Sequence, residues 1–150
     1  MSKIMFVCTG NICRSPMAEV MARDVFPKEG LEGYEFVSSG VAAMEGFGAT
    51  DEVAQVLGAL KLDVSKHRAR YVSAKDIDAC SHVFAMTRAH LDALLRQYPK
   101  SRDKIHLLSE YASSEGDVHD PYMLGLGAYE ECREVLMSHL LAVAKRLREE

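Results

Sequence analysis

A cysteine and an arginine frame a short polar segment near the N-terminus, Cys8-Thr9-Gly10-Asn11-Ile12-Cys13-Arg14-Ser15. An ionised thiol is a strong nucleophile, and a guanidinium presents a planar pair of donors that fits two oxygens of a phosphate. A nucleotide-binding loop would need Gly-Lys-Ser or Gly-Lys-Thr where this chain has Cys13-Arg14-Ser15. The residue types therefore favour nucleophilic chemistry on a phosphate group over nucleotide binding.

The residues on either side predict a strand, a tight turn and a helix. Residues 3–7 are apolar and partly β-branched, which is typical of a buried strand. After the loop, Ser15 suits an N-cap and Pro16 a first helical position, and apolar residues follow at helical spacing. Such a turn gathers backbone N–H groups at a helix N-terminus, which favours an anion and favours the thiolate of Cys8 over its thiol.

Composition narrows the class of protein. The chain has 150 residues, 48% of them apolar, as expected for one domain with its own core. A net charge of −4 without a basic run argues against nucleic acid or an anionic membrane as partner. No apolar run reaches the length of a membrane span, and the N-terminal one is too short for a signal peptide, so we expect a cytoplasmic protein. Four cysteines without Cys-x2-Cys spacing predict neither a zinc site nor structural disulfides.

The rest of the chain alternates between strand and helix patterns. Further strands are expected at residues 34–41, 81–87 and 104–108; helices after Thr50, after Ser73, at 91–98 and at 129–147; and a long loop at 111–127. This alternation predicts an α/β fold, a doubly wound four-stranded parallel sheet with helices on both faces, in a single domain over residues 1–150. Ligands of such folds bind beyond the carboxyl ends of the strands, where Cys8 is expected.

Two motifs far apart in the chain resemble those of the low-molecular-weight protein tyrosine phosphatases. Residues 7–16 match the phosphate loop of that family, and His119-Asp120-Pro121-Tyr122 matches its Asp-Pro loop. The likeness runs the whole length, because residues 38–40, 67–70 and 83–86 fall where family segments would. The resemblance implies the same four-stranded parallel fold, a phosphorylated protein or peptide as substrate and no cofactor. We expect a monomer or weak self-association.

The resemblance also assigns chemical roles to individual residues. Cys8 would attack phosphorus and form a phosphocysteine, Arg14 would bind two phosphoryl oxygens, and Asp120 would act first as general acid and then as general base. The Ser15 hydroxyl would hydrogen-bond the Cys8 thiolate. The remaining phosphate-binding groups would come from the same loop: Thr9, Gly10, Asn11, Ile12, Cys13 and Ser15.

Further residues would support the loop or line the cleft. In the family an asparagine at the position of Asn11 holds a left-handed turn, and Ser39 and His67 match the residues that brace it. Tyr122 would form one wall of the substrate cleft, with Met123 where the family often has a second aromatic residue. Phe47 would contribute to the opposite wall. By the same resemblance, Cys13 would form a protective disulfide with Cys8.

Four functions remain open from the sequence. The first is metal-independent hydrolysis of phosphotyrosine in proteins, for which Ile12 offers an apolar wall to an aromatic ring. A phosphoarginine phosphatase is the alternative, although that branch carries threonine in place of Ile12. An arsenate reductase would need a third thiol near Cys80, and the stretch to Thr87 has none. A silent phosphate-binding module would have no use for Asp120.

Overall fold

Strand β1 (Ser2–Cys8), which leads into the cysteine–arginine loop, lies in the interior of a four-stranded parallel sheet. The computed structural model describes residues 2–150, so Met1 of the expected domain lies outside the described residues. The strand order is β2-β1-β3-β4, with β2 at Tyr34–Gly40, β3 at His82–Ala85 and β4 at Ile105–Leu107. The predicted α/β fold with a parallel sheet is confirmed.

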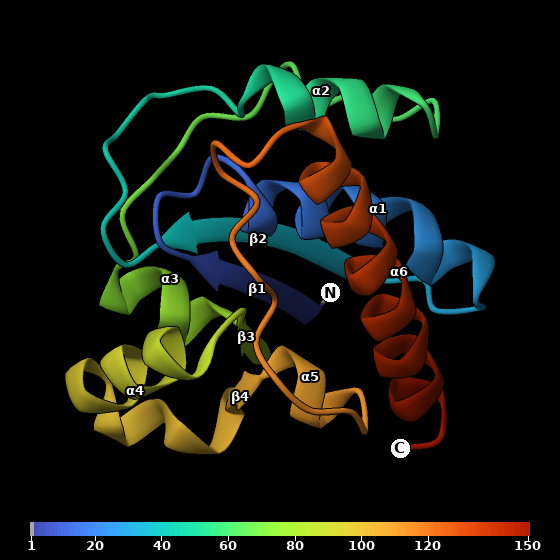
Figure 1. The fold of residues 1–150 in the computed structure, drawn as a ribbon. Helices are drawn as coiled ribbons and strands as arrows, with labels where there is room; N and C mark the ends of the chain where they lie inside the picture. The colour runs from blue at the N-terminus through green and yellow to red at the C-terminus, as the bar shows by residue number, and fades with distance from the viewer. Residues whose placement is uncertain (1) are drawn as a thin grey trace.

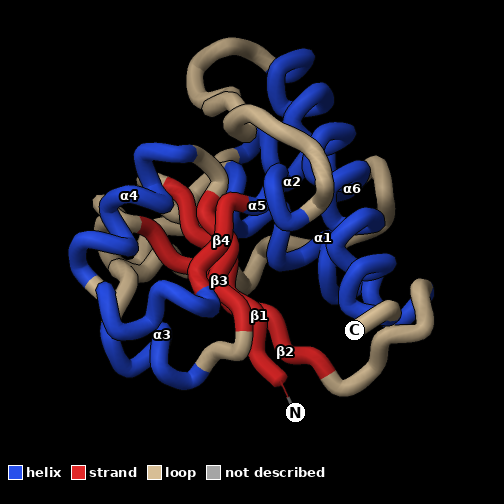
Figure 2. The backbone as a smooth tube through the Cα atoms, turned by 90° about the horizontal axis from the view of Figure 1, so that it is seen from below, coloured by secondary structure: helices blue, strands red, loops and turns tan. Residues whose placement is uncertain are grey.

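Helices cover both faces of this sheet (Figures 1 and 2). Their bounds are α1 (Arg14–Lys28), α2 (Asp51–Gly58), α3 (Ala74–Ala79), α4 (Arg88–Gln97), α5 (Leu108–Tyr111) and α6 (Leu126–Arg148), with a 3-10 helix at Pro99–Lys104. Figure 2 shows α3 and α4 on one side of the strands and α1, α2, α5 and α6 on the other. The sheet is therefore doubly wound, as the alternation of strands and helices predicts.

The side-chain alternation of β1 divides the apolar interior into two parts. Ile4 and Phe6 pack with α1, α2 and α6, whereas Met5 and Val7 pack with α3 and α4. All four of these side chains are fully buried. A strand buried on both faces reads as a continuous apolar run, which explains why residues 3–7 show no polar alternation.

Helix starts agree with the sequence at two places and differ at one. Thr50 accepts a hydrogen bond from Val53 N, and Ser73 accepts one from Asp76 N, so both predicted caps are confirmed. The prediction of Ser15 as the N-cap of α1 is wrong, because that helix begins at Arg14 and has no side-chain cap. The Ser15 hydroxyl instead turns toward Cys8 and Asn11.

Three strands and one loop are shorter than predicted. Strand β2 ends at Gly40 rather than at residue 41. Strand β3 ends at Ala85 rather than at residue 87, since Thr87 leaves the sheet to cap α4 by accepting from His90 N. Strand β4 is limited to Ile105–Leu107, and α5 takes up the start of the expected loop 111–127. The chain then crosses to α6 in front of the sheet (Figure 1). Across residues 2–150, no helix combines the length and the apolar character needed to cross a membrane.

Candidate active site

Cys8 lies at the carboxyl end of β1, where the chain turns into α1. Its side chain is buried, and its Sγ atom lies 2.9 Å from the Ser15 hydroxyl oxygen. A hydroxyl at this distance can donate to a thiolate and stabilise its charge. Helix α1 begins directly after the loop, and the positive end of its dipole stabilises a thiolate or a bound anion at this place.

Asn11 fixes the shape of the loop between Cys8 and α1. It adopts a left-handed backbone conformation with φ of 57° and is fully buried. Its side-chain nitrogen donates to Ser15 Oγ at 2.8 Å and to Ser38 Oγ at 3.0 Å, while its side-chain oxygen accepts from Arg70 N at 3.0 Å. The backbone oxygen of Asn11 accepts from His67 Nε2 at 2.6 Å. These bonds hold a conformation that few residues other than glycine and asparagine tolerate.

The expectation that Ser39 braces Asn11 is wrong, because the side chain of β2 that contacts Asn11 is that of Ser38. Side chains alternate along β2, so Ser38 shares the α1 face of the sheet with Phe36, and Ser39 points to the opposite face. The Ser39 hydroxyl donates to Met5 Sδ at 3.1 Å. Only the backbone oxygen of Ser39 reaches the loop, where it accepts from Ser15 Oγ at 3.4 Å.

Gly40, at the end of β2, lies directly against the loop. It pairs with Cys8 in the parallel register of the sheet. A Cβ atom at this position would lie 2.4 Å from the backbone oxygen of Thr9 and 3.0 Å from the backbone nitrogen of Asn11. Glycine is therefore required for the close approach of β2 and the loop.

Arg14 is held by hydrogen bonds on two sides, and its Nε donor has no partner among the described residues. It is 5% exposed, and it donates from Nη1 to the backbone oxygen of Val118 at 3.0 Å and from Nη2 to Thr9 Oγ1 at 3.4 Å. Its Nε atom is buried and has no hydrogen-bond partner among the described residues. Because a buried donor without a partner is costly, this N–H group marks a place suited to an anion.

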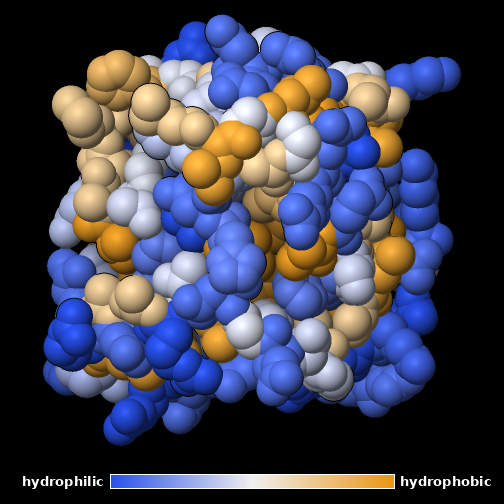
Figure 3. Space-filling view, viewed as in Figure 1, coloured by the Kyte–Doolittle hydropathy of each residue, from blue (hydrophilic) through white to orange (hydrophobic). Residues whose placement is uncertain are grey.

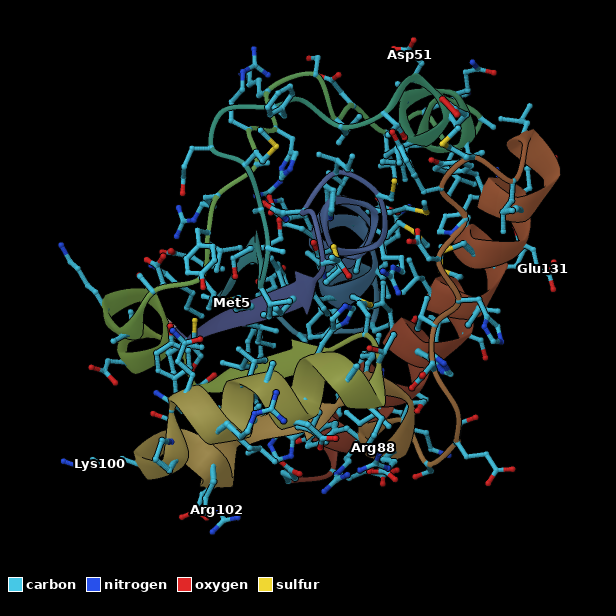
Figure 4. The ribbon with its side chains drawn as sticks, turned by 60° about the vertical axis from the view of Figure 1, so that its left-hand side comes forward. Met5, Asp51, Arg88, Lys100, Arg102 and Glu131 are labelled. Carbon is cyan, nitrogen blue, oxygen red and sulfur yellow. The ribbon has the colours of Figure 1, made fainter. Side chains whose placement is uncertain are left out.

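The loop that carries Asp120 is anchored to the neighbouring strand before it reaches the site. Val118 N donates to the backbone oxygen of Met86 at 2.9 Å, and Asp117 Oδ1 accepts from Arg88 N at 2.8 Å. Arg88 is labelled in Figure 4 at the end of α4 that faces this loop. Asp120 itself is half-exposed, and its Oδ1 atom accepts from Tyr122 N at 3.1 Å. The anchored residues thus set the position of a carboxylate that remains open to solvent.

One cavity of about 190 Å³ collects most of the predicted site residues. It is lined by Cys8, Thr9, Gly10, Ile12, Cys13, Arg14, Asp120 and Tyr122. Phe47 is outside this lining: its side chain is 56% exposed, and its backbone oxygen accepts from Ala69 N. Among residues 2–150, no group of three or more His, Cys, Asp or Glu side chains is arranged to hold a metal ion.

Comparisons with known proteins match this arrangement along the whole chain. The profile of the family described as low molecular weight phosphotyrosine protein phosphatase matches residues 3–150. The chain belongs to this family. It is 34% identical over 149 residues to a protein-arginine-phosphatase of Geobacillus stearothermophilus, covering 99% of this chain and 97% of that protein. It is 36% identical over 156 residues to a low molecular weight protein-tyrosine-phosphatase of Streptomyces coelicolor, covering 99% of this chain and 94% of that protein.

A solved structure supports the same assignment. The low molecular weight protein tyrosine phosphatase from T. tengcongensis has a TM-score of 0.93 and 37% sequence identity to this chain. The match covers 97% of this chain and 99% of that one. The fold is therefore that of a low molecular weight phosphatase.

The cysteines of this phosphatase fall into different surroundings. Cys13 lies in the loop with its Sγ atom 3.3 Å from the hydroxyl oxygen of buried Tyr129, and desolvation raises the pKa of its thiol. Cys132 on α6 is buried, which raises its pKa to about 12. Cys80 packs with Met5 and Val7 in the part of the core under α3 and α4, on the other side of the sheet from Cys8. This position offers no support for a thiol relay between Cys8 and Cys80.

Sequence reasoning missed several residues that shape the site. Ser38 could have been found from the period-2 pattern of its strand, since Phe36 and Ser38 must share a face. The roles of Gly40, of the Val118 backbone oxygen and of His90, whose Nε2 lies 2.7 Å from Thr9 Oγ1, depend on contacts between distant segments. No local pattern in the sequence predicts such contacts.

Proposed function

We propose that this phosphatase hydrolyses phosphotyrosine in proteins through a phosphocysteine intermediate and without a metal. The observation that carries the proposal is the single cavity shared by Cys8, Arg14 and Asp120. It combines a nucleophile, a buried guanidinium with a free Nε donor and a carboxylate. Phosphate binding alone would not need the carboxylate, so the set supports catalysis rather than a silent binding module.

In the first step the Cys8 thiolate attacks phosphorus, and the bond from phosphorus to the phenolic oxygen breaks. Asp120, protonated at this stage, gives its proton to the leaving oxygen. In the second step the Asp120 carboxylate takes a proton from water, whose oxygen attacks phosphorus and breaks the bond to sulfur. Arg14 and the backbone N–H groups of the loop stabilise the charge on the equatorial phosphoryl oxygens in both transition states.

The cavity walls support an aromatic leaving group. Ile12 and Tyr122 both line the cavity, and together they offer apolar and aromatic surface to a flat ring. Beside Tyr122, exposed hydrophobic side chains gather before and at the start of α6 (Figure 3): Met123, Leu124 and Leu126. An apolar rim of this kind suits contact with a protein substrate, which we place in the cytoplasm.

Phosphoarginine in proteins is the second candidate substrate. The relative from Geobacillus stearothermophilus, named a protein-arginine-phosphatase, gives this candidate its support. Against it stands Ile12, whose side chain has no group that could accept a hydrogen bond from a guanidinium leaving group. A buried N–H left without a partner costs about 1–3 kcal/mol, which is about tenfold or more in rate.

A panel of peptides carrying phosphotyrosine, phosphoserine or phosphoarginine tests the proposal, assayed with a chelator present. We expect the highest kcat/KM for phosphotyrosine, unchanged by the chelator, and no turnover by Cys8→Ser, whose hydroxyl does not ionise in the loop. Quenching the wild-type reaction in acid should trap a phosphoryl group on Cys8. Activity that survives in Cys8→Ser would refute the phosphocysteine route, and a preference for phosphoarginine would replace the first candidate by the second.

A further inference from the structure

His90 touches the phosphate loop, although the proposed mechanism gives it no role. It lies in the first turn of α4 and is 5% exposed, and its backbone nitrogen donates to Thr87 Oγ1 at 3.2 Å. Its Nε2 atom lies 2.7 Å from Thr9 Oγ1. The same hydroxyl oxygen accepts from Arg14 Nη2 at 3.4 Å, and Thr9 lines the catalytic cavity. The buried imidazole of His90 and the buried guanidinium of Arg14 therefore both contact the hydroxyl of Thr9, an exposed residue.

The hydrogen-bonding capacity of Thr9 decides where its proton points. A threonine hydroxyl has one proton to donate and two lone pairs that accept. A guanidinium only donates, so Arg14 occupies the first lone pair. The role of His90 depends on which of its two ring nitrogens carries the proton.

The buried side of the imidazole favours the proton on Nε2. His90 Nδ1 is buried and has no hydrogen-bond partner among residues 2–150. A proton on Nδ1 would thus leave a buried N–H group unsatisfied, and such donors are rarer in proteins than unsatisfied acceptors. With the proton on Nε2, His90 donates to Thr9 Oγ1 and occupies the second lone pair. The proton of Thr9 is then left for an acceptor in the cavity.

We propose that His90 is a positioning residue which, together with Arg14, fills both acceptor sites of the Thr9 hydroxyl and so directs its proton at a phosphoryl oxygen of the substrate. Thr9 would be a side-chain donor to the reacting group, in addition to the backbone N–H groups of the loop. The inference rests on the proposed function, because it assumes that a phosphoryl group occupies the cavity beside Arg14.

The surroundings of His90 keep the imidazole neutral. Burial lowers the pKa of His90 to about 4, and the nearby Arg14 cation acts in the same direction. Near neutral pH the ring therefore adds no positive charge that would compete with Arg14 for the phosphate. A neutral ring also keeps one N–H and one lone pair, the state that the proton count requires.

Two matched substitutions at position 90 test the role. The side-chain amide nitrogen of His90→Gln can reach the place of Nε2, whereas that of His90→Asn corresponds to Nδ1 and falls short of Thr9. We expect His90→Gln to keep kcat/KM for a phosphotyrosine peptide within about threefold of wild type and His90→Asn to lose about tenfold. The inhibition constant of inorganic phosphate should weaken in His90→Asn and not in His90→Gln. A merely structural histidine would not distinguish the two amides in this way.

A second pair of variants tests the hydroxyl itself. Thr9→Ser keeps the hydroxyl, and we expect kcat/KM of Thr9→Val to be about 10–100-fold below that of Thr9→Ser, since valine removes a donor to the reacting phosphate. The double variant Thr9→Val/His90→Asn should be no slower than Thr9→Val alone, because both changes remove one interaction. Losses that multiply in the double variant would overturn the proposal.

Other outcomes separate this inference from the proposed function. Equal activity of Thr9→Val and Thr9→Ser would overturn the role of the hydroxyl even if both His90 variants failed to fold. Turnover by Cys8→Ser would instead refute the proposed mechanism, whatever the variants at positions 9 and 90 do. If the wild type prefers phosphoarginine, the same variants are measured on that substrate, since the phosphoryl group is common to both.

Discussion

Asp120 faces Arg14 across the catalytic cavity, with 3.7 Å between its Oδ2 atom and Nη2 of the arginine. The arginine side chain is buried and the aspartate side chain is 55% exposed. A long, half-exposed ion pair of this kind contributes at most about 1 kcal/mol to stability. In the proposed mechanism Asp120 can therefore exchange protons with a bound substrate and with water, and it contributes little to holding the fold together.

Asp120→Asn is the first test of this placement. The amide cannot give up a proton to the leaving oxygen, so we expect kcat for a phosphotyrosine peptide to fall by about 10²–10⁴-fold. Aryl phosphates with acidic phenols should lose less, because their leaving oxygen needs less protonation. The free energy of unfolding in urea should change by less than about 1 kcal/mol. An unchanged rate with a poor leaving group would show that another residue is the acid.

The neighbouring serines of β2 provide a matched pair. Ser38→Ala removes one of the two acceptors of the Asn11 side-chain nitrogen, and we expect about a tenfold loss in kcat/KM as the left-handed turn loosens. Ser39→Ala leaves its backbone oxygen in place for Ser15 and should stay within about threefold of wild type. Steady-state kinetics of both variants on one phosphotyrosine peptide decide the point. The reverse order of the two losses would contradict the network described for Asn11.

Ile12→Thr tests the choice of substrate. Threonine can accept a hydrogen bond from a guanidinium, so we expect the ratio of kcat/KM for phosphotyrosine over phosphoarginine peptides to fall by about tenfold. Phosphocysteine formation should persist, because Cys8 and Arg14 are untouched. Ile12→Val serves as the control that keeps an apolar wall. A ratio that shifts equally in both variants would locate the specificity elsewhere.

Acid should unfold the protein in part through His90. Its pKa is about 4 in the folded protein, below the ordinary value of 6.5. The unfolded chain therefore binds a proton first as pH falls, so stability is complete above about pH 6.5 and is lost between pH 6.5 and 4. The loss has a limiting slope of about 1.4 kcal/mol per pH unit.

Urea unfolding of wild type and His90→Gln at pH 7, 6 and 5 isolates this contribution. Glutamine does not titrate, so the free energy of unfolding of the variant should fall less steeply with decreasing pH. Other histidines, such as His82, His106 and His139, are common to both proteins and cancel in the difference. Parallel curves for the two proteins would show that His90 does not titrate in this range.

The sequence was sufficient to predict features that depend on local patterns. It was insufficient to predict features that depend on contacts between distant segments of the folded chain. The strand before Cys8, the caps at Thr50 and Ser73 and the parallel sheet follow from periodicity and capping chemistry. Ser15 shows where local reasoning fails. A serine near a helix start is a good cap, yet the hydroxyl of Ser15 hydrogen-bonds the Cys8 thiol and the Asn11 side-chain amide instead of capping α1. These two partners come within reach of the hydroxyl only once the loop has folded.

Residues around the cavity illustrate the same limit. His90 sits in a helix start that the sequence does not connect with Thr9, and only the pairing of β1 with β3 brings α4 to the loop. Phe47 was expected to line the cleft because its loop follows β2, but it lies outside the cavity lining. Proximity in sequence to a strand end does not determine which way a loop side chain points.

The hydrogen bonds that hold Asn11 join segments that are translated at different times. Cys8 is translated before the partners of Asn11, which follow from β2 and from residues 67–70. The backbone oxygen that anchors Arg14, at Val118, and the carboxylate of Asp120 emerge later still. A nascent chain shorter than this carries the cysteine and the arginine but neither their fixed geometry nor the proton donor. Synthesis itself thus delays phosphatase activity until the chain has been translated at least as far as Asp120.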